Sequence, residues 1–257
     1  MGIMSERIAQ RAQASGRARS SVHRRRRSWL RRIVLLTVGV VFVIPVLLIV
    51  LFRFVPPPIT PLMLGAWIGE GAISQTWAPL SAISPNLVRA VIASEDAKFC
   101  SHHGFDWDAI DKAIERNATG ANLHGASTIS QQTAKNLFLP PDRTWTRKGI
   151  EAYLTVLIEA LWPKRRILET YLNIIEWGPG RFGAEAAAQA DFKKPAAKLS
   201  VIEAARLAAV LPNPKEYSAV KPGPYVTRQA EVVAARMGEV RRDNLDGCIL
   251  RQSAVKD

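Results

Sequence analysis

Cysteine is scarce in this chain of 257 residues, whose two cysteines are Cys100 and Cys248. Neither belongs to a CxxC motif or to a Cys/His pair with the spacing of metal ligands, so the sequence shows no metal site. The two cysteines could pair in an oxidising compartment. Their wide separation along the chain instead favours two unpaired thiols.

Alternation of apolar and polar residues, which marks half-buried strands, is absent over any useful length, and no internal repeat is found. Apolar residues instead recur at helical spacing, so we predict a mainly α fold. The clearest helix covers about residues 146–161, where the apolar face consists of Ile150, Tyr153, Leu154, Leu157, Ile158 and Leu161. Other helices are expected at about 84–103, 106–117, 128–139, 163–175, 184–190 and 200–211.

Acidic residues are almost missing from the first 32 residues, which hold ten arginines and one acid, Glu6, for a net charge of +9 out of the formal +13. The remaining residues are therefore only mildly basic. A basic tail of this kind could bind nucleic acid. The segment that follows it favours a different interpretation.

Charged residues are absent from Ile33 to Phe52, a run of 20 residues. A helix of that length rises about 30 Å, the thickness of a bilayer core. The run is longer than the apolar part of a cleaved signal and no small-residue cleavage pattern follows it, so we predict an uncleaved signal anchor. The arginines would keep the tail in the cytoplasm and place the rest of the chain outside. We therefore expect membrane contact and no nucleic-acid partner.

The helix that begins near residue 84 carries the first candidate site residue. Ser84 caps it and Pro85 occupies its first position. Glu95 lies four residues after Val91 and four before Phe99, so it should share their inward face. Apolar neighbours raise the pKa of a carboxyl group, as a general acid or base requires. An isolated glutamate would more often be exposed or cap a helix.

Two further segments concentrate polar residues on helices. Residues 125–136 run from a small-residue loop into a helix start, where backbone N–H groups can bind an anion, and an ordinary capped helix would look similar. Arg147 and Glu151 can pair at i and i+4. On a helix surface such a pair contributes about 0.5 kcal/mol or less.

The order of these motifs is more specific than any one of them. The sequence contains EDAKFCSHHGFD (95–106), GASTISQQTAKNLF (125–138), RKGIEA (147–152), KRRILETYLN (164–173) and WGPGRFGAEAAAQADF (177–192). This series resembles the peptidoglycan glycosyltransferase family, in its monofunctional biosynthetic form, over about residues 60–220. The resemblance implies a lysozyme-like, mostly helical domain with a large lobe and a smaller lobe that faces the membrane.

The resemblance also implies a reaction and roles for residues. Lipid II would be polymerised into β-1,4-linked glycan strands with inversion, and undecaprenyl pyrophosphate would leave. Glu95 matches the general base that deprotonates the acceptor 4-hydroxyl, and Glu151 matches a second essential carboxylate in the donor cleft. The positions that match diphosphate contacts are Lys135, Arg143 and Arg147. The positions that match polar groups lining the cleft are Ser127, Gln132 and Asn136.

From this we expect a cytoplasmic tail at 1–32, a transmembrane anchor at 33–55, a connector at 56–82, a glycosyltransferase core at 83–221 and a C-terminal extension at 222–257. Bifunctional relatives carry a penicillin-binding domain, for which no SxxK–KTG set is present here, so we expect a monofunctional chain. Two positions depart from the family pattern: Ala126 replaces a glycine, and Asp191-Phe192 replaces Tyr-Phe.

The expected partners are lipid II, the growing lipid-linked glycan strand, the membrane, and other cell-wall synthesis and division proteins. The expected location is the inner membrane, crossed once, with the catalytic domain in the periplasm. No protein metal site is legible, although Mg²⁺ or Mn²⁺ could bridge the substrate pyrophosphate. Two rival hypotheses remain, a lysozyme-like enzyme that cleaves the same polymer and a non-catalytic scaffold for cell-wall assembly.

Overall fold

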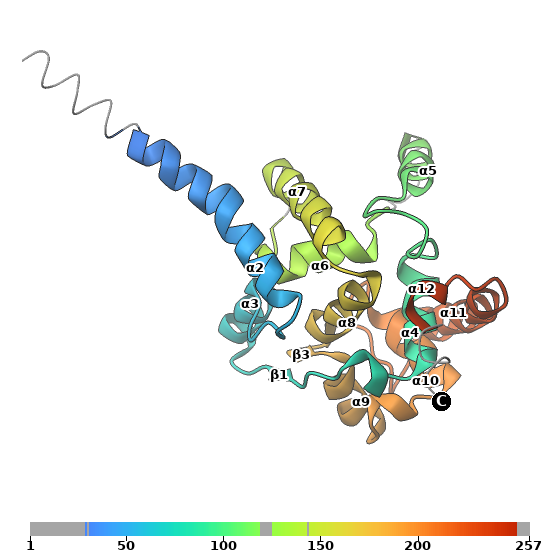
Figure 1. Cartoon of the computed structure of the whole chain (residues 1–257). Helices are drawn as coiled ribbons and strands as arrows, with labels where there is room; N and C mark the ends of the chain where they lie inside the picture. The colour runs from blue at the N-terminus through green and yellow to red at the C-terminus, as the bar shows by residue number, and fades with distance from the viewer. Residues whose placement is uncertain (1–28, 30, 119–124, 143, 251–257) are drawn as a thin grey trace, which may run out of the picture. The chain divides into compact units, whose positions relative to one another are not determined.

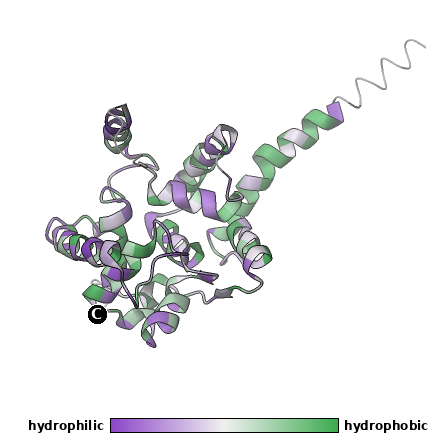
Figure 2. Cartoon of the chain, turned by 180° about the vertical axis from the view of Figure 1, so that it is seen from behind, coloured by the Kyte–Doolittle hydropathy of each residue, from purple (hydrophilic) through white to green (hydrophobic). Residues whose placement is uncertain are grey.

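The computed structural model describes residues 29, 31–118, 125–142 and 144–250, and the chain divides into two units, Met1–Val50 and Leu51–Asp257 (Figure 1). The described part of the first unit is helical. It belongs to a helix over Arg31–Phe54 that is long and apolar enough to cross a membrane. Figure 2 shows that its residues are hydrophobic almost throughout. The predicted apolar run, Ile33–Phe52, lies inside this helix.

A proline inside this helix is accommodated by a local change of winding. Gly39–Val43 forms a π-helical turn, in which the N–H of Ile44 donates to the carbonyl of Gly39, and the α-helix α2 (Ile44–Phe52) continues from there through Pro45. Proline lacks an N–H group and its ring clashes with the carbonyl four residues earlier. The wider π turn just before Pro45 gives that ring room.

The second unit is mainly helical, as predicted. Its helices are α3 (Pro61–Glu70), α4 (Pro85–Glu95), α5 (Trp107–Ala118), α6 (Ile129–Phe138), α7 (Trp145–Leu161), α8 (Lys164–Ile174), α9 (Ala184–Phe192), α10 (Val201–Val210), α11 (Pro224–Arg242) and α12 (Gly247–Leu250), with short 3-10 turns at Leu80–Ala82 and Ala196–Lys198. Three short strands, β1 (Ser74–Gln75), β2 (Glu176–Gly178) and β3 (Arg181–Phe182), form a sheet in the order β1-β3-β2. Strand β1 runs parallel to β3, and β2 runs antiparallel to it.

One part of the core is the packing of α4, α10 and α11 against one another. Val91 faces inward on α4 as predicted, and Leu87, Val88 and Ile92 are fully buried with it. The helix expected at about 200–211 is present as α10, and a capping box of Ser200 and Glu203 begins it. Helix α11 lies in the segment expected to be a C-terminal extension, yet it buries Val226, Ala230, Val233, Met237 and Val240.

The segment expected to be a connector, 56–82, is likewise part of the fold. It contains α3 and β1, and β1 pairs with β3. Asn173 on α8 holds its end, since its side-chain N–H donates to Ala78 O and its side-chain oxygen accepts from Ala78 N, both at 2.8 Å. No local sequence pattern predicts this contact between Asn173 and Ala78, because the two residues are 95 positions apart.

A second part of the core is formed by α6, which packs against α7 and α8. The predicted inward face of α7 is wrong by part of a turn, because Ile150 is 50% exposed while Glu151 is 2% exposed. The buried residues are Glu151, Leu154, Thr155 and Ile158. The predicted face rested on the hydrophobicity of the residues alone. The ion pairs of Glu151, described below, allow its carboxylate to face the core in place of Ile150.

Helix α4 ends at Glu95, earlier than the predicted end at Gly104. Asp96 leaves the helical region with φ −164° and ψ 76°, and residues 97–101 form turns. Gly104 has φ +94°, a conformation that favours glycine, and an added Cβ would lie 2.9 Å from Thr155 Cγ2 and 3.2 Å from Glu159 Cγ. The chain can pass close to α7 there only because the residue has no side chain.

The expectation of unpaired thiols is wrong, because Cys100 and Cys248 form a disulfide with their Cα atoms 5.6 Å apart. The separation of 148 residues is bridged because α11 folds back along α4 and α10 and returns the chain to the loop that follows α4. Distance along the sequence therefore did not indicate distance in space.

We expect Gly104→Ala to lower the free energy of unfolding by about 1–3 kcal/mol, because it adds both backbone strain and a clash. Gly238→Ala is the matched control, since Gly238 lies within α11 and an added Cβ there meets nothing within 4 Å. That change should be neutral or stabilising by up to about 1 kcal/mol. Denaturant unfolding of both variants in detergent measures the difference, and equal stability of the two would contradict the expectation.

Candidate active site

Glu95 is held at the end of α4 by a chain of hydrogen bonds. Gln132 Nε2 on α6 donates to Glu95 Oε2 at 2.8 Å, and the Tyr171 hydroxyl on α8 donates to Gln132 Oε1 at 3.2 Å. Tyr171 is fully buried, and that burial raises its pKa well above 10.0, so it remains a donor at neutral pH. The Gln132 oxygen is thus engaged, and its N–H group is turned toward Glu95.

Burial raises the pKa of Glu95 above its ordinary value. The hydrogen bond from Gln132 and the charge of Lys135 lower this pKa, the neighbouring Asp96 raises it, and the bond to Ser94 lowers it, but burial outweighs them. Glu95 is half-buried, and the direction of its pKa shift agrees with the prediction of an inward glutamate with a raised pKa. A carboxylate of this kind is a better proton acceptor than an exposed one.

The loop after Glu95, residues 96–104, is tied to the start of α6. His102 Nε2 lies 2.9 Å from both carboxylate oxygens of Asp96, and Asp96 Oδ2 accepts from the N–H of Ile129 at 3.0 Å. His102 Nδ1 accepts from the N–H of Gly104 at 3.1 Å, so Nε2 carries the proton that Asp96 accepts. Asp96 is 7% exposed, and its carboxylate caps the first residue of α6.

A second carboxylate, Glu151, is 2% exposed and is paired with two cations on its own helix. Arg147 NH1 lies 2.9 Å from Glu151 Oε2, and Lys148 Nζ forms an ion pair with Glu151 Oε1. Lys148 Nζ also lies 3.4 Å from the hydroxyl of Ser127. Glu151 thus organises the basic groups around it, and a buried carboxylate needs such partners.

Lys135 on α6 lies within the electrostatic reach of both carboxylates. Burial lowers its pKa most, Arg147 and Lys148 lower it further, and Glu151 and Glu95 raise it. Buried and near two other cations, this ammonium group would gain from an added anion. The described residues thus bring three basic side chains together beside Glu151.

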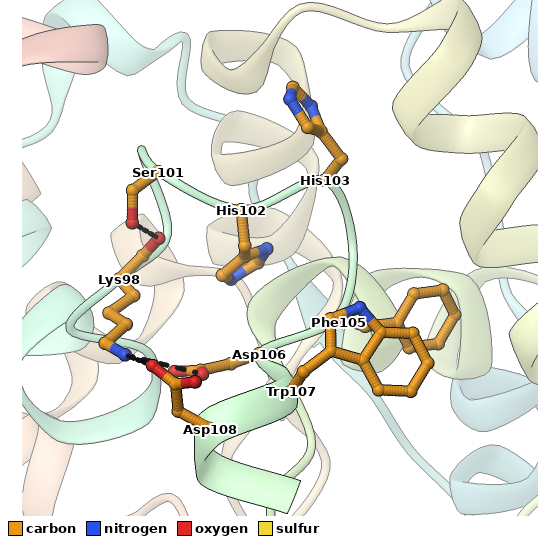
Figure 3. Close-up of a pocket in the computed structure, with 8 residues that line it drawn as sticks. All are labelled: Lys98, Ser101, His102, His103, Phe105, Asp106, Trp107 and Asp108. Carbon is orange, nitrogen blue, oxygen red and sulfur yellow. Dashed lines mark hydrogen bonds and ion pairs between the residues drawn. The ribbon is translucent and has the colours of Figure 1, made fainter.

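Glu95 lines a cavity of about 270 Å³, together with Asp106, Ser127, Thr128, Arg236 and neighbouring small residues. Asp106 also lines an adjoining hollow of about 400 Å³ (Figure 3). Lys98 reaches across that hollow to Asp106 and Asp108. The carboxylate therefore opens onto a space large enough for a sugar ring.

The structure brings most of the predicted site residues together. Gln132 donates a hydrogen bond to Glu95, and Arg147 forms an ion pair with Glu151. Lys135 interacts electrostatically with both carboxylates, and Ser127 lines the cavity of Glu95. Asn136 is 8% exposed in α6, and no contact among the described residues joins it to either glutamate. Arg143 lies outside the described residues. The catalytic and binding roles themselves stay predictions.

Several residues of the site were not predicted. Lys148 could have been found, because it precedes Glu151 by three positions and therefore shares its helix face. Tyr171 and Arg236 carry no such signal, since they reach the site from α8 and α11. Only the tertiary fold places them there.

A protein-bound metal does not fit the site. Among the residues that the structure describes, no group of three His, Cys, Asp or Glu residues could hold an ion. Both carboxylate oxygens of Glu151 are already engaged by cations. The arrangement offers one shielded carboxylate as a base and, beside it, a positively charged zone that suits a phosphorylated group.

Comparisons with known proteins agree with this geometry. A family model described as Transglycosylase matches residues 64–238. The chain is 56% identical over 223 residues to the biosynthetic peptidoglycan transglycosylase of Rhodospirillum centenum, which covers 86% of this chain and 96% of that protein. The protein of the same name from Caulobacter vibrioides is 49% identical over 223 residues, with 87% and 97% covered. The chain belongs to the transglycosylase family, the glycosyltransferases of peptidoglycan synthesis.

Proposed function

We propose that the chain polymerises lipid II into β-1,4-linked glycan strands and releases undecaprenyl pyrophosphate. The observation that carries this proposal is the presence of a half-buried base, Glu95, near a cluster of cations. The base takes the proton of the acceptor 4-hydroxyl, whose oxygen attacks the anomeric carbon of the growing chain. The bond to the pyrophosphate breaks on the opposite face, so the configuration inverts.

The cations supply what the leaving group needs. A departing diphosphate carries about two negative charges, which Lys and Arg donors stabilise. Lys135, Arg147 and Lys148 gather beside Glu151, and Arg147 Nε is buried with no hydrogen-bond partner among the described residues. An unpaired buried donor gains from an acceptor supplied by substrate. A glycan-cleaving enzyme releases no diphosphate, so this cluster favours synthesis over cleavage.

A divalent cation could bridge the substrate pyrophosphate. Mg²⁺ or Mn²⁺ would be carried by the substrate diphosphate, because the residues beside Glu151 do not form a metal site. In that place it would add positive charge near the leaving oxygens.

Two observations support the expected orientation, and a third supports contact of the second unit with a membrane. The arginines precede the apolar helix, which favours a cytoplasmic N-terminus. The disulfide between Cys100 and Cys248 favours an oxidising compartment for the second unit. Exposed apolar side chains on α3, namely Leu64, Trp67 and Ile68, suit contact with a lipid surface. We therefore propose an inner-membrane enzyme whose catalytic domain faces the periplasm.

We expect Glu95→Gln to lower turnover by at least about 100-fold, because glutamine cannot accept the proton. The assay is polymer formation from labelled lipid-linked disaccharide-pentapeptide, with lysozyme digestion of the product. Glu231→Gln, a change at an exposed position on α11, is the control and should keep normal turnover.

More than a tenth of the wild-type rate in Glu95→Gln would exclude Glu95 as the general base. Release of muropeptides from sacculi, without polymer formation, would favour the lytic enzyme. Full complementation of a dependent strain by the Glu95→Gln copy would favour the scaffold.

The acid limb of the pH profile should report Glu95. The group works as a carboxylate, so kcat/KM should rise as the pH passes upward through the raised pKa of Glu95. Gln132→Leu removes a hydrogen bond that lowers this pKa, so the limb should move to higher pH. Gln189→Leu, which removes an exposed bond to Glu185, should leave the limb in place. A limb that stays fixed or moves to lower pH in Gln132→Leu would contradict the assignment.

Lys135→Ala should lower the rate at limiting substrate by about 10-fold or more, the usual loss for a hydrogen bond to a charged group. Lys221→Ala, at an exposed position, is the charge-matched control. Rates measured below KM separate the two variants. An unchanged rate in Lys135→Ala would remove this lysine from the donor site.

A further inference from the structure

The last described segment of the chain, residues 244–250, lies beyond the region that the family model matches, which ends at residue 238. We call this segment the clasp. It contains α12 and Cys248, and the disulfide to Cys100 joins it to the loop at residues 96–104. The clasp is therefore covalently attached five residues after Glu95, although it lies outside the residues that the family model matches.

Two contacts anchor the clasp to helices α4 and α8. Asp246 pairs with Arg89 on α4, with Arg89 Nε 2.7 Å from Asp246 Oδ2 and the Asp246 side chain 6% exposed. The guanidinium of Arg165 on α8 donates to the carbonyl of Ile249, whose side chain is fully buried. The clasp thus connects α4 and α8, the helices that carry Glu95 and Tyr171, with the loop between α4 and α5.

The two sides of the loop at residues 96–104 differ in how firmly their contacts fix them. Its inner side is fixed by the Asp96–His102 contact and by Phe99, which is fully buried under the ammonium group of Lys164 at 4.5 Å from the ring centroid. Its outer turn, at residues 97–101, carries the exposed side chains of Lys98 and Ser101 (Figure 3). The half-buried Cys100 belongs to the same turn. Apart from the disulfide, side chains of that turn form the ion pairs of Lys98, whose side chain is 47% exposed, and a bond from the Ser101 hydroxyl to the carbonyl of Lys98 within the turn. Exposed ion pairs constrain a loop weakly.

We propose that the clasp is a redox-dependent positioning device for the catalytic loop. This inference rests on the proposed function. The intact disulfide restrains the outer turn. Asp96 and His102 then hold the start of α6 in a fixed position relative to the carboxylate of Glu95. Cys100 and Cys248 do not line the cavity of Glu95 and touch no reacting atom. They are positioning residues, and their effect travels through the loop.

The switching reaction is ordinary disulfide exchange. A dithiol such as dithiothreitol breaks the bond between the sulfurs and supplies two electrons and two protons, giving two cysteine thiols and a cyclic disulfide of the reductant. Oxidised glutathione reverses the reaction and leaves as two reduced molecules. Both cysteines are half-buried, so a small thiol can reach them.

The first test measures kcat and KM of the full chain in detergent, well below its unfolding temperature. The forms compared are oxidised wild type, wild type with dithiothreitol, and C100S/C248S. A misplaced catalytic group can cost a large factor in rate, so kcat should fall by about 10-fold or more in both altered forms, with KM within about twofold. Reoxidation should restore wild type, and dithiothreitol should not change C100S/C248S.

A second readout needs no activity. Hydrogen exchange should become faster at the amides of residues 96–104 and at the N–H of Ile129 after reduction, while the core amides of α10 keep their protection. A purely structural staple would lower the unfolding temperature, with kcat unchanged at low temperature, and that result would overturn the proposal. Faster exchange spread over the whole unit, or none in the loop, would overturn it as well. If oxidised wild type makes no polymer, the proposed function fails, and the exchange experiment still decides whether the clasp restrains the loop.

Discussion

The architecture depends on two carboxylates, the buried Glu151 and the half-buried Glu95, which both lie within the electrostatic reach of Lys135 but have different electrical surroundings. Burial penalises a charged carboxylate unless an opposite charge or hydrogen bonds compensate for it. Glu151 is compensated in full, because Arg147 and Lys148 contact its two oxygens. Glu95 is compensated only in part, by an amide and by the field of Lys135, so its pKa stays raised. One carboxylate thereby organises positive charge, and the other is available for proton transfer.

Much of the surrounding fold maintains the different environments of Glu95 and Glu151. Helix α6 carries Gln132 and Lys135, so a single element presents the amide to Glu95 and places the ammonium group within the electrostatic reach of both carboxylates. Its start is fixed by Asp96, and its side is fixed by α7 and α8. The early end of α4 follows from the same contacts, because Asp96 can reach Ile129 only after leaving the helix. A longer α4 would carry that carboxylate away from α6.

The sequence predicted what depends on short-range patterns. Helical spacing predicted the mainly α class and the inward position of Glu95, and the i,i+4 rule predicted the contact of Arg147 with Glu151. It did not predict which face of α7 is buried, because the two cations that neutralise Glu151 outweigh the apolar signal of Ile150. It also missed what depends on the path of the chain. The disulfide, Tyr171 and Arg236 reach their partners only after helices far apart in sequence have packed together.

The two halves of the site are coupled by their charges. Lys135 lowers the pKa of Glu95, so an anion that neutralises Lys135 weakens that effect. A diphosphate bound beside Lys135 would therefore raise the pKa of Glu95 further and make it a stronger base when the donor is in place. The same anion would relieve the repulsion that Arg147 and Lys148 exert on Lys135. In the proposed mechanism, donor binding and the strength of the base would thus be linked by electrostatics, and that link needs no movement of the backbone.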